Sequence, residues 1–270
     1  MTRIKITLAA LTALTPFLAP LWAVPAGAQQ LATPPPIRPE PPQVFKLIDP
    51  GPAVADWPSY NYDRERSGWN RGETQLSKKT VGQLKPLWNK GLLAQTPPAQ
   101  VLSTLTAPLV AAGVSTPGGA KDLVFTIAMD DTLTALDAGS GDIVWQKHFA
   151  NPLKPLRPMV INCSNTEQAT PTIDKAKAII YFTTSDGKLR GAKLGDGAEA
   201  ITPTDMVQPF SRNWSLNLVD NVVYTTTARG CGGSPAEPVE IGSVVAMDVS
   251  DPAHPAISRF YTSKGRPAGP

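Results

Sequence analysis

The sequence predicts an all-β fold: a β-propeller of four-stranded blades that form an incomplete ring. A sequence pattern of short apolar strands and tight turns recurs along the chain, most clearly as AMDDTLTALDAGSGDIVW at residues 128–145. Charged residues make up only 17% of the chain and 29 residues are proline. This composition favours short strands and turns over solvated helices.

The first copy of the repeat contains four predicted strands, at residues 105–110, 123–127, 132–136 and 143–147. Asp130-Asp131 and the Ala-Gly-Ser-Gly stretch at 138–141 provide the turn chemistry that joins neighbouring antiparallel strands. Four short strands joined by tight turns make one up-and-down sheet.

Two further copies follow. The second comprises QATPTID and AIIYFTTSDGKLRGAKLGDG, and the third, which is looser, comprises WSLNLVDNVVYTTT and SVVAMDVSD. The central hairpins start at Val124, Ile180 and Val223, which are 56 and 43 residues apart. A period of about 40–50 residues is expected of propeller blades, which bury their faces against one another. A β-sandwich is the alternative architecture.

Two segments precede the predicted propeller, which we expect to span residues 56–270. Residues 1–28 combine a basic start, an apolar run and Ala26-Gly27-Ala28 as a cleavage site, which is typical of a secretory signal peptide. A membrane anchor is the alternative, but three prolines interrupt the run. Residues 29–55 form a proline-rich leader with polyproline II character. The mature protein is therefore expected to be periplasmic or secreted, with no membrane anchor.

The start of the propeller is rich in aromatic residues. Trp57, Tyr60 and Tyr62 lie within six residues of one another. Further on, Ser77 is a suitable N-cap for a single helical turn, and a strand is expected through Leu87-Trp88.

Charge and motif content exclude several functions. Without Arg3 and Lys5 the net charge falls from +3 to about +1, so electrostatics gives no reason to expect a nucleic-acid partner. The two histidines lie on different repeats, which argues against a histidine-rich zinc site. The sequence has no Cys-x-x-Cys-His motif for covalent haem, so any electron acceptor is expected to be a separate protein.

The pattern Asp-x-x-x-Ala-Leu-Asp-x-x-(Ser/Thr)-Gly-x-x-x-Trp resembles the pyrroloquinoline quinone (PQQ) propeller repeat. The residues that match it are Asp131, Ala135, Leu136, Asp137, Gly141 and Trp145. The segment DWPSYNYDRERSGWN is similar to the opening of quinoprotein alcohol dehydrogenases. This resemblance implies about four of the eight blades that such a ring contains. It therefore implies the N-terminal part of a larger propeller, either truncated or completed by another polypeptide.

The resemblance also implies roles for the repeat residues. Asp137 and Gly141 are expected to hold the tight turn between the third and fourth strands. Trp145 and Trp88 are expected to pack one blade on the next rather than to bind a cofactor.

In these dehydrogenases PQQ lies on the propeller axis beside Ca²⁺, which prefers carboxylate and amide oxygens. The loop after Thr227 often carries an asparagine ligand in the family, and that ligand is missing here. Arg229 is a candidate partner for a PQQ carboxylate, with Cys231 beside the cofactor. Glu167 and Glu237 are candidate metal ligands. The alternative is that the glutamates are solvated loop charges and that Arg229 caps a carbonyl.

The two cysteines, Cys163 and Cys231, are expected to form a disulfide in an exported protein. Closing this loop would contribute roughly 4 kcal/mol in the chain-entropy account. The bridge would place the loops at 162–168 and 228–233 at the same end of the propeller. Two independent buried thiols are the alternative.

The sequence therefore predicts part of an exported quinoprotein-type dehydrogenase, inactive as this fragment. The complete enzyme would oxidise an alcohol or sugar through PQQ and Ca²⁺. Its partners would be a periplasmic electron acceptor or the missing half of the propeller. The alternative function is a non-catalytic PQQ-like propeller that acts as an interaction scaffold in the cell envelope.

Overall fold

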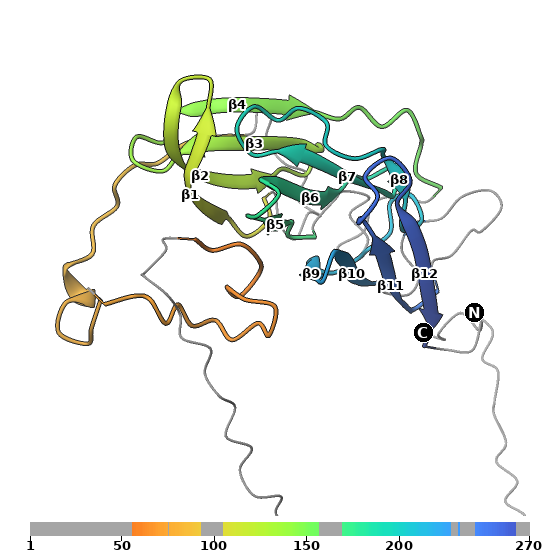
Figure 1. The fold of residues 1–270 in the computed structure, drawn as a ribbon, viewed down its shortest axis with the longest axis horizontal. Helices are drawn as coiled ribbons and strands as arrows, with labels where there is room; N and C mark the ends of the chain where they lie inside the picture. Colours follow the sequence, from red (N-terminus) through yellow and green to blue (C-terminus); the bar gives the residue numbers. More distant parts are fainter. Residues whose placement is uncertain are drawn as a thin grey trace, which may run out of the picture. The chain divides into compact units, whose positions relative to one another are not determined.

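Three antiparallel sheets of four strands each make up the regular structure (Figure 1). The computed structural model describes residues 56–74, 76–92, 105–156, 169–227, 232 and 241–262. In these residues the only helix is a single 3₁₀ turn, η1 (Val81–Gln83), and none is long and apolar enough to cross a membrane. The predicted signal peptide and leader lie outside the described residues.

The strands of each sheet follow one another in chain order. The first sheet is formed by β1 (Leu109–Thr116), β2 (Gly119–Ile127), β3 (Thr132–Asp137) and β4 (Ile143–His148). The second sheet is formed by β5 (Thr172–Asp174), β6 (Ile179–Thr183), β7 (Lys188–Lys193) and β8 (Thr204–Asp205). The third sheet is formed by β9 (Asn217–Val219), β10 (Val222–Thr227), β11 (Ser243–Asp248) and β12 (Ala256–Tyr261). The predicted repeat is confirmed, with three sheets in the described residues where about four were expected.

The first strand was predicted in the wrong place. It was expected at residues 105–110, but β1 begins at Leu109 and continues to Thr116. Pro108 has no N–H to donate, so the ladder begins after it, and Leu105 makes only an isolated bridge with Ala128. The strand then continues to a turn in which the Thr116 hydroxyl donates to the Gly119 carbonyl at 2.7 Å.

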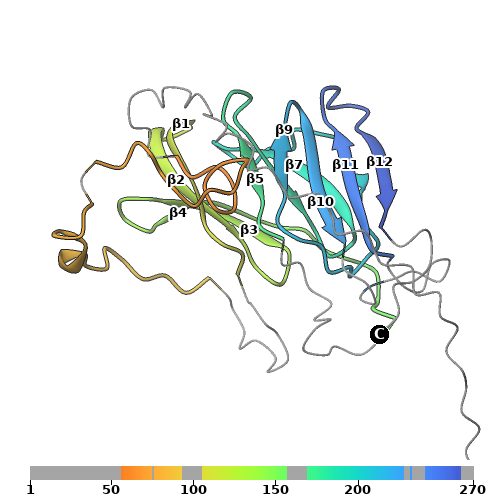
Figure 2. The same ribbon diagram turned by 90° about the horizontal axis from the view of Figure 1, so that it is seen from below.

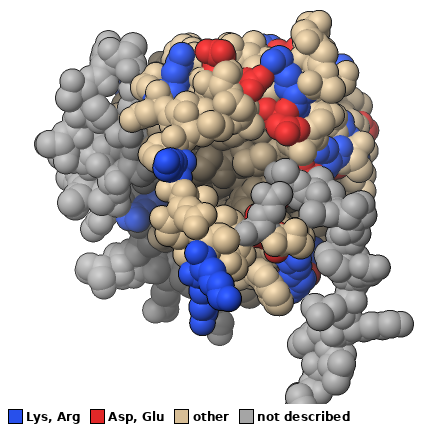
Figure 3. Space-filling model, turned by 90° about the vertical axis from the view of Figure 1, so that its left-hand side faces the viewer, with Lys and Arg blue, Asp and Glu red and all other residues tan. Residues whose placement is uncertain are grey.

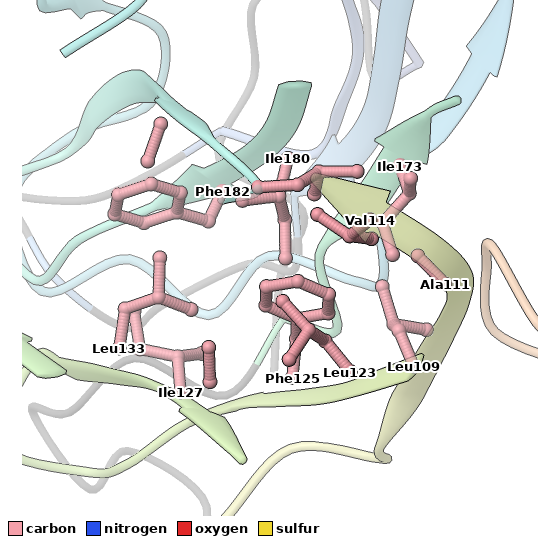
Figure 4. Close-up of a cluster of buried hydrophobic side chains, with 13 residues drawn as sticks. Leu109, Ala111, Val114, Leu123, Phe125, Ile127, Leu133, Ile173, Ile180 and Phe182 are labelled. Carbon is pink, nitrogen blue, oxygen red and sulfur yellow. The ribbon is translucent and has the colours of Figure 1, made fainter. Parts of the chain in front are cut away.

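The three sheets are stacked side by side as separate layers, with hydrophobic cores between them (Figure 2). Alternate residues of β6 point into the two cores. Ile180 lies over Phe125 and Phe182 over Leu133 of the first sheet, as Figure 4 shows. Tyr181 belongs to the other core, with Val223 of the third sheet. The apolar run IIYFT is therefore buried on both faces, each side chain contributing about 1.5–3 kcal/mol. This arrangement confirms radial stacking of blades and excludes a sandwich for the described residues.

Trp145 joins the first sheet to the second, as predicted, whereas Trp88 docks on the first sheet without belonging to a sheet itself. The Trp145 indole N–H donates to the Leu194 carbonyl at 2.8 Å, and its ring fills the space above Gly197. Trp88 repeats this arrangement on the first sheet, where its indole donates to the Ala138 carbonyl at 2.9 Å and its ring covers Gly141.

Two local predictions before the first sheet need correction. Residues 84–92 form no strand, so Trp88 docks from an irregular segment. The helical turn is present but begins at Val81, because Ser77 and Thr80 bond to each other and form a separate turn before it.

Residues 56–67, which we call the strap, run along the free edges of the first two sheets. Trp57 exchanges two backbone hydrogen bonds with Val110 of β1, at 2.8 and 3.0 Å. The next carbonyl, of Pro58, accepts the N–H of Ile173 in β5 at 2.8 Å. The strap thus satisfies edge groups of both strands, and it is coloured orange beside β2 and β5 in Figure 2.

The strap also reaches the third sheet. The Arg66 guanidinium donates to the Ser215 carbonyl at 2.7 Å, and the Asn217 amide donates to the Arg64 carbonyl at 2.9 Å. One short segment near the start of the folded part therefore contacts the first strand of each sheet or the residues just before it.

Candidate functional site

The residues predicted to carry chemistry lie outside the described residues: Cys163, Glu167, Arg229, Cys231 and Glu237. The disulfide and the ligand roles stay predictions. The described residues that flank these loops show which end of the sheets they leave from. Strands β2, β6 and β10 all finish at the end of the sheets where β5 begins.

Gly232, the residue after Cys231, is described and lies at this end. Its φ is +73°, and a Cβ there would stand 2.5 Å from the Ser211 nitrogen and 2.6 Å from the Pro209 oxygen. Only glycine fits so close to another backbone in this conformation. The neighbouring Phe210 N–H donates to the Ser185 carbonyl at 2.7 Å. The described neighbour of Cys231 therefore packs on the loop that contacts the β6–β7 turn.

Asp131 joins the β2–β3 turn to the β6–β7 turn of the next sheet. Its carboxylate accepts the Ser185 N–H at 2.9 Å and the Ser185 hydroxyl, and the residue is 3% exposed. Its φ is +60°, and the matching turn position in the second sheet is Gly187, with φ +84°. Aspartate is one of the few side chains tolerated in this left-handed region.

Burial raises the pKa of Asp131 to about 6, with smaller contributions from the charges of Asp186 and Asp130. The two hydrogen bonds from Ser185 act in the opposite direction. Because both carboxylate oxygens bind Ser185 and almost nothing of the residue reaches solvent, Asp131 serves as a clamp between two sheets. It does not present a proton acceptor to a substrate.

A second charged group supports the clamp. Asp186 and Arg190 form a largely buried ion pair at 2.7 Å, and Arg190 also donates to the Thr184 hydroxyl at 2.9 Å. The guanidinium lies 5.2 Å from the ring centre of Phe149, whose N–H donates to the Asp131 carbonyl. The β6–β7 turn at residues 184–187 is therefore held by Asp131 of the first sheet and by Arg190 of its own sheet.

Asn213 extends the polar contacts to the third sheet. It is buried, its amide donates to the Thr183 hydroxyl at 3.1 Å, and its backbone pairs with Thr227. Its side-chain oxygen has no hydrogen-bond partner in the described residues. All three sheets are therefore joined by polar side chains at one end.

Sequence reasoning matched Asp131 to the repeat but missed its partner Ser185 and the supporting Asn151, whose amide donates to the Ser185 hydroxyl at 2.9 Å. The available signal was the Ser-Asp-Gly turn of the second copy, aligned with Asp-Asp in the first. Across the ranges that the structure describes, no three His, Cys, Asp or Glu side chains are grouped closely enough to hold a metal ion. The described part of this end therefore does not itself provide a calcium site.

No protein-family model matches this sequence, and no curated protein matches it. Solved structures do. The chain is similar to the quinohemoprotein alcohol dehydrogenase ADHIIG from Pseudomonas putida HK5, with a TM-score of 0.50 and 18% identity over 79% of this chain. The chain therefore shares the propeller fold of part of this enzyme. This likeness confirms the predicted resemblance at the level of the fold.

Two further structures are similar. They are a quinohemoprotein alcohol dehydrogenase from Comamonas testosteroni (TM-score 0.49, 15% identity, 76% of this chain and 27% of that chain) and a europium-containing methanol dehydrogenase (TM-score 0.46, 15% identity, 77% and 33%). The chain spans 27% of the length of the Pseudomonas enzyme.

Proposed function

We propose that this chain supplies blades to an exported quinoprotein-type dehydrogenase that oxidises an alcohol or sugar through PQQ. The observation that carries this proposal is the stack of three four-stranded sheets with tryptophans over turn glycines. Trp145 joins the first sheet to the second over Gly197, and Trp88 docks on the first sheet over Gly141. The Pseudomonas structure that shares this fold is named an alcohol dehydrogenase. Electrons would pass to a separate periplasmic carrier.

The cofactor would be held at the end of the sheets where Asp131 and Asn213 lie. Arg229 would bind a PQQ carboxylate and Cys231 would lie beside the quinone, while Glu167 and Glu237 would ligate Ca²⁺. PQQ would supply the hydride acceptor. Because the chain spans 27% of the similar dehydrogenase, other blades would complete the site, and this chain alone would not turn over substrate.

Cofactor retention tests the proposal. The protein, alone and together with the polypeptide that completes its ring, is incubated with PQQ and Ca²⁺ and passed over a gel-filtration column. Quinone absorbance is expected to elute with the completed ring, and Arg229→Ala and Glu167→Gln are expected to reduce it. Asp205→Asn, an exposed carboxylate at the edge of β8, is the matched control that should leave retention unchanged.

A completed ring that retains no quinone would rule out the dehydrogenase. The second candidate function, an interaction scaffold without a cofactor, would then be favoured. One observation favours a macromolecular partner in either case: the outward face of the third sheet carries exposed apolar side chains, namely Tyr224, Val244 and Phe260. The corresponding face of the first sheet packs against the second sheet, and that of the second sheet packs against the third. We propose that the missing part of the propeller covers this face.

A further inference from the structure

Residues 60–71, here called the arginine loop, form a self-contained structure that continues from the strap. The Gly68 N–H donates to the Asn61 carbonyl at 2.9 Å and closes the loop. Inside it, the Asp63 carboxylate accepts the Ser67 N–H at 2.8 Å and the Ser67 hydroxyl at 2.6 Å. The loop therefore has a defined shape although it contains no helix or strand.

Arginines stack on exposed aromatic rings in this loop. The guanidinium carbon of Arg66 lies 5.8 Å from the ring centre of Tyr60, and that of Arg71 lies 5.2 Å from the ring centre of Trp69. Tyr60 is 39% exposed and Trp69 is 60% exposed. Exposed aromatic side chains that gather on one surface are typical of interaction sites.

The residues before β9 repeat the same pairing. The guanidinium carbon of Arg212 lies 5.1 Å from the ring centre of Trp214, which is 49% exposed. The bond from Arg66 to the carbonyl of Ser215, the residue after Trp214, holds the arginine loop against this segment. Arg66, with its ring partner Tyr60, thus lies beside the segment that carries the Arg212–Trp214 pair, about 150 positions away in the sequence.

The arginines of this loop differ in their charge partners. Arg64 forms an ion pair with Glu65 at 2.9 Å. The Asp63 carboxylate accepts from Ser67, and against the opposing effect of burial these hydrogen bonds, and to a smaller extent the charge of Arg71, lower the pKa of Asp63. Arg66 and Arg71 have no carboxylate within 4 Å in the part of the chain that the structure describes. A guanidinium stacked on a ring keeps its in-plane N–H donors, which match the two oxygens of a carboxylate.

We propose that this surface, formed by Tyr60, Arg66, Trp69, Arg71 and Trp214, binds an acidic segment of a partner polypeptide. Tyrosine, tryptophan and arginine are the residues that dominate protein-binding hot spots. General charge attraction does not account for such binding, because the mature chain is close to neutral and acidic side chains lie among the basic ones on the face seen in Figure 3. The proposal does not depend on PQQ or on catalysis.

Binding of a ten-residue glutamate peptide to the full chain tests this proposal. Tryptophan fluorescence is expected to report binding, since Trp69 and Trp214 belong to the surface. Arg71→Gln is expected to weaken the affinity at least threefold, and the Arg66→Gln/Arg71→Gln double variant at least tenfold. Raising the salt concentration from 50 to 300 mM should weaken wild-type binding, as it does for charge-assisted contacts.

The matched control is Lys147→Gln, an exchange of one positive charge on β4 of the first sheet, which should leave the affinity unchanged. Among the described residues Arg71 makes no hydrogen bond or ion pair with the sheets, so Arg71→Gln tests the surface even if Arg66→Gln disturbs the contact with Ser215. Equal binding of a ten-residue lysine peptide, or equal affinity of the wild type and the double variant, would overturn the proposal. A sulfated polysaccharide that binds while the glutamate peptide does not would also overturn it.

Discussion

Folding strongly changes the acidity of the Asp131 carboxyl group. Burial raises its pKa to about 6, above the ordinary value of 3.8. Between these values the folded protein holds a proton that the unfolded chain has released, so the free energy of unfolding falls as pH rises through this window. We expect Asp131 to account for a loss of about 1–3 kcal/mol between pH 4 and pH 7. Urea denaturation of the wild type and of Asp131→Asn at several pH values gives the free energy of unfolding as a function of pH. The contribution of Asp131 is the difference between the two pH dependences.

Asparagine tolerates the left-handed backbone and still accepts a hydrogen bond from Ser185, so the variant removes the titration and keeps the turn. Asp205→Asn is the control, because that carboxylate is exposed, and it should keep the wild-type pH profile. If Asp131→Asn shows the same slope as the wild type, Asp131 does not titrate in this window.

At the scale of the element, the contact between tryptophan and glycine fixes how closely two sheets approach. A Cβ on Gly197 would stand 2.8 Å from the ring of Trp145, and its φ of +68° strains any larger residue. Gly197→Ala is therefore expected to lower the free energy of unfolding by about 2–4 kcal/mol. Thermal and urea denaturation of the variant measure this loss.

Gly118→Ala is the matched control. The nearest atom to a Cβ there is the Thr116 side-chain oxygen at 3.8 Å, which is ordinary contact. Its effect should stay within about 0.5 kcal/mol. Because Gly118 lies outside the left-handed region, similar losses for the two variants would show that neither the tryptophan contact nor the backbone strain at Gly197 causes the loss.

Elements with strong local signals were predictable from sequence. The Asp-Asp, Asp-Gly and Gly-x-Gly turns correctly predicted β3, β6, β7 and the end of β2, because turn chemistry acts over a few residues. β2 begins at Gly119, four residues before the predicted start. The apolar run at 105–110 suggested a strand, but Pro108 within it has no N–H for the ladder, so β1 begins after the proline. The Asp131 clamp could not be predicted in full, since its partner Ser185 lies 54 residues away and is brought close only by stacking of the sheets.

At the scale of the whole molecule, the strap ties the sheets together along their free edges. Trp57 packs against the first core and pairs with Val110, and the next carbonyl holds Ile173. Trp57→Ala is expected to lower the free energy of unfolding by about 2–4 kcal/mol. It should also speed hydrogen exchange at the Val110 and Ile173 amides, which belong to different sheets. Exchange followed by mass spectrometry checks both sites at once.

Trp69→Ala provides the comparison for this experiment. Trp69 lies in the same part of the chain but is mostly exposed, so its removal should leave both amides protected. If Trp57→Ala speeds exchange at Val110 alone, the strap protects each sheet separately and does not couple them.

The outward face of the third sheet determines how the whole molecule behaves in solution. Phe260 is 69% exposed and lies beside Val244, its cross-strand neighbour on β11. An exposed apolar sheet face favours association, because each Å² of apolar surface that is removed from water contributes about 25 cal/mol of stabilisation.

We expect the isolated chain to self-associate as its concentration rises. Phe260→Glu is expected to shift the equilibrium towards the monomer at least fivefold. Sedimentation velocity measures the shift, with Leu153→Glu, an exposed leucine away from this sheet face, as the control. If both variants change association equally, the sheet face is not the contact, and the proposal that further blades cover it loses its physical basis.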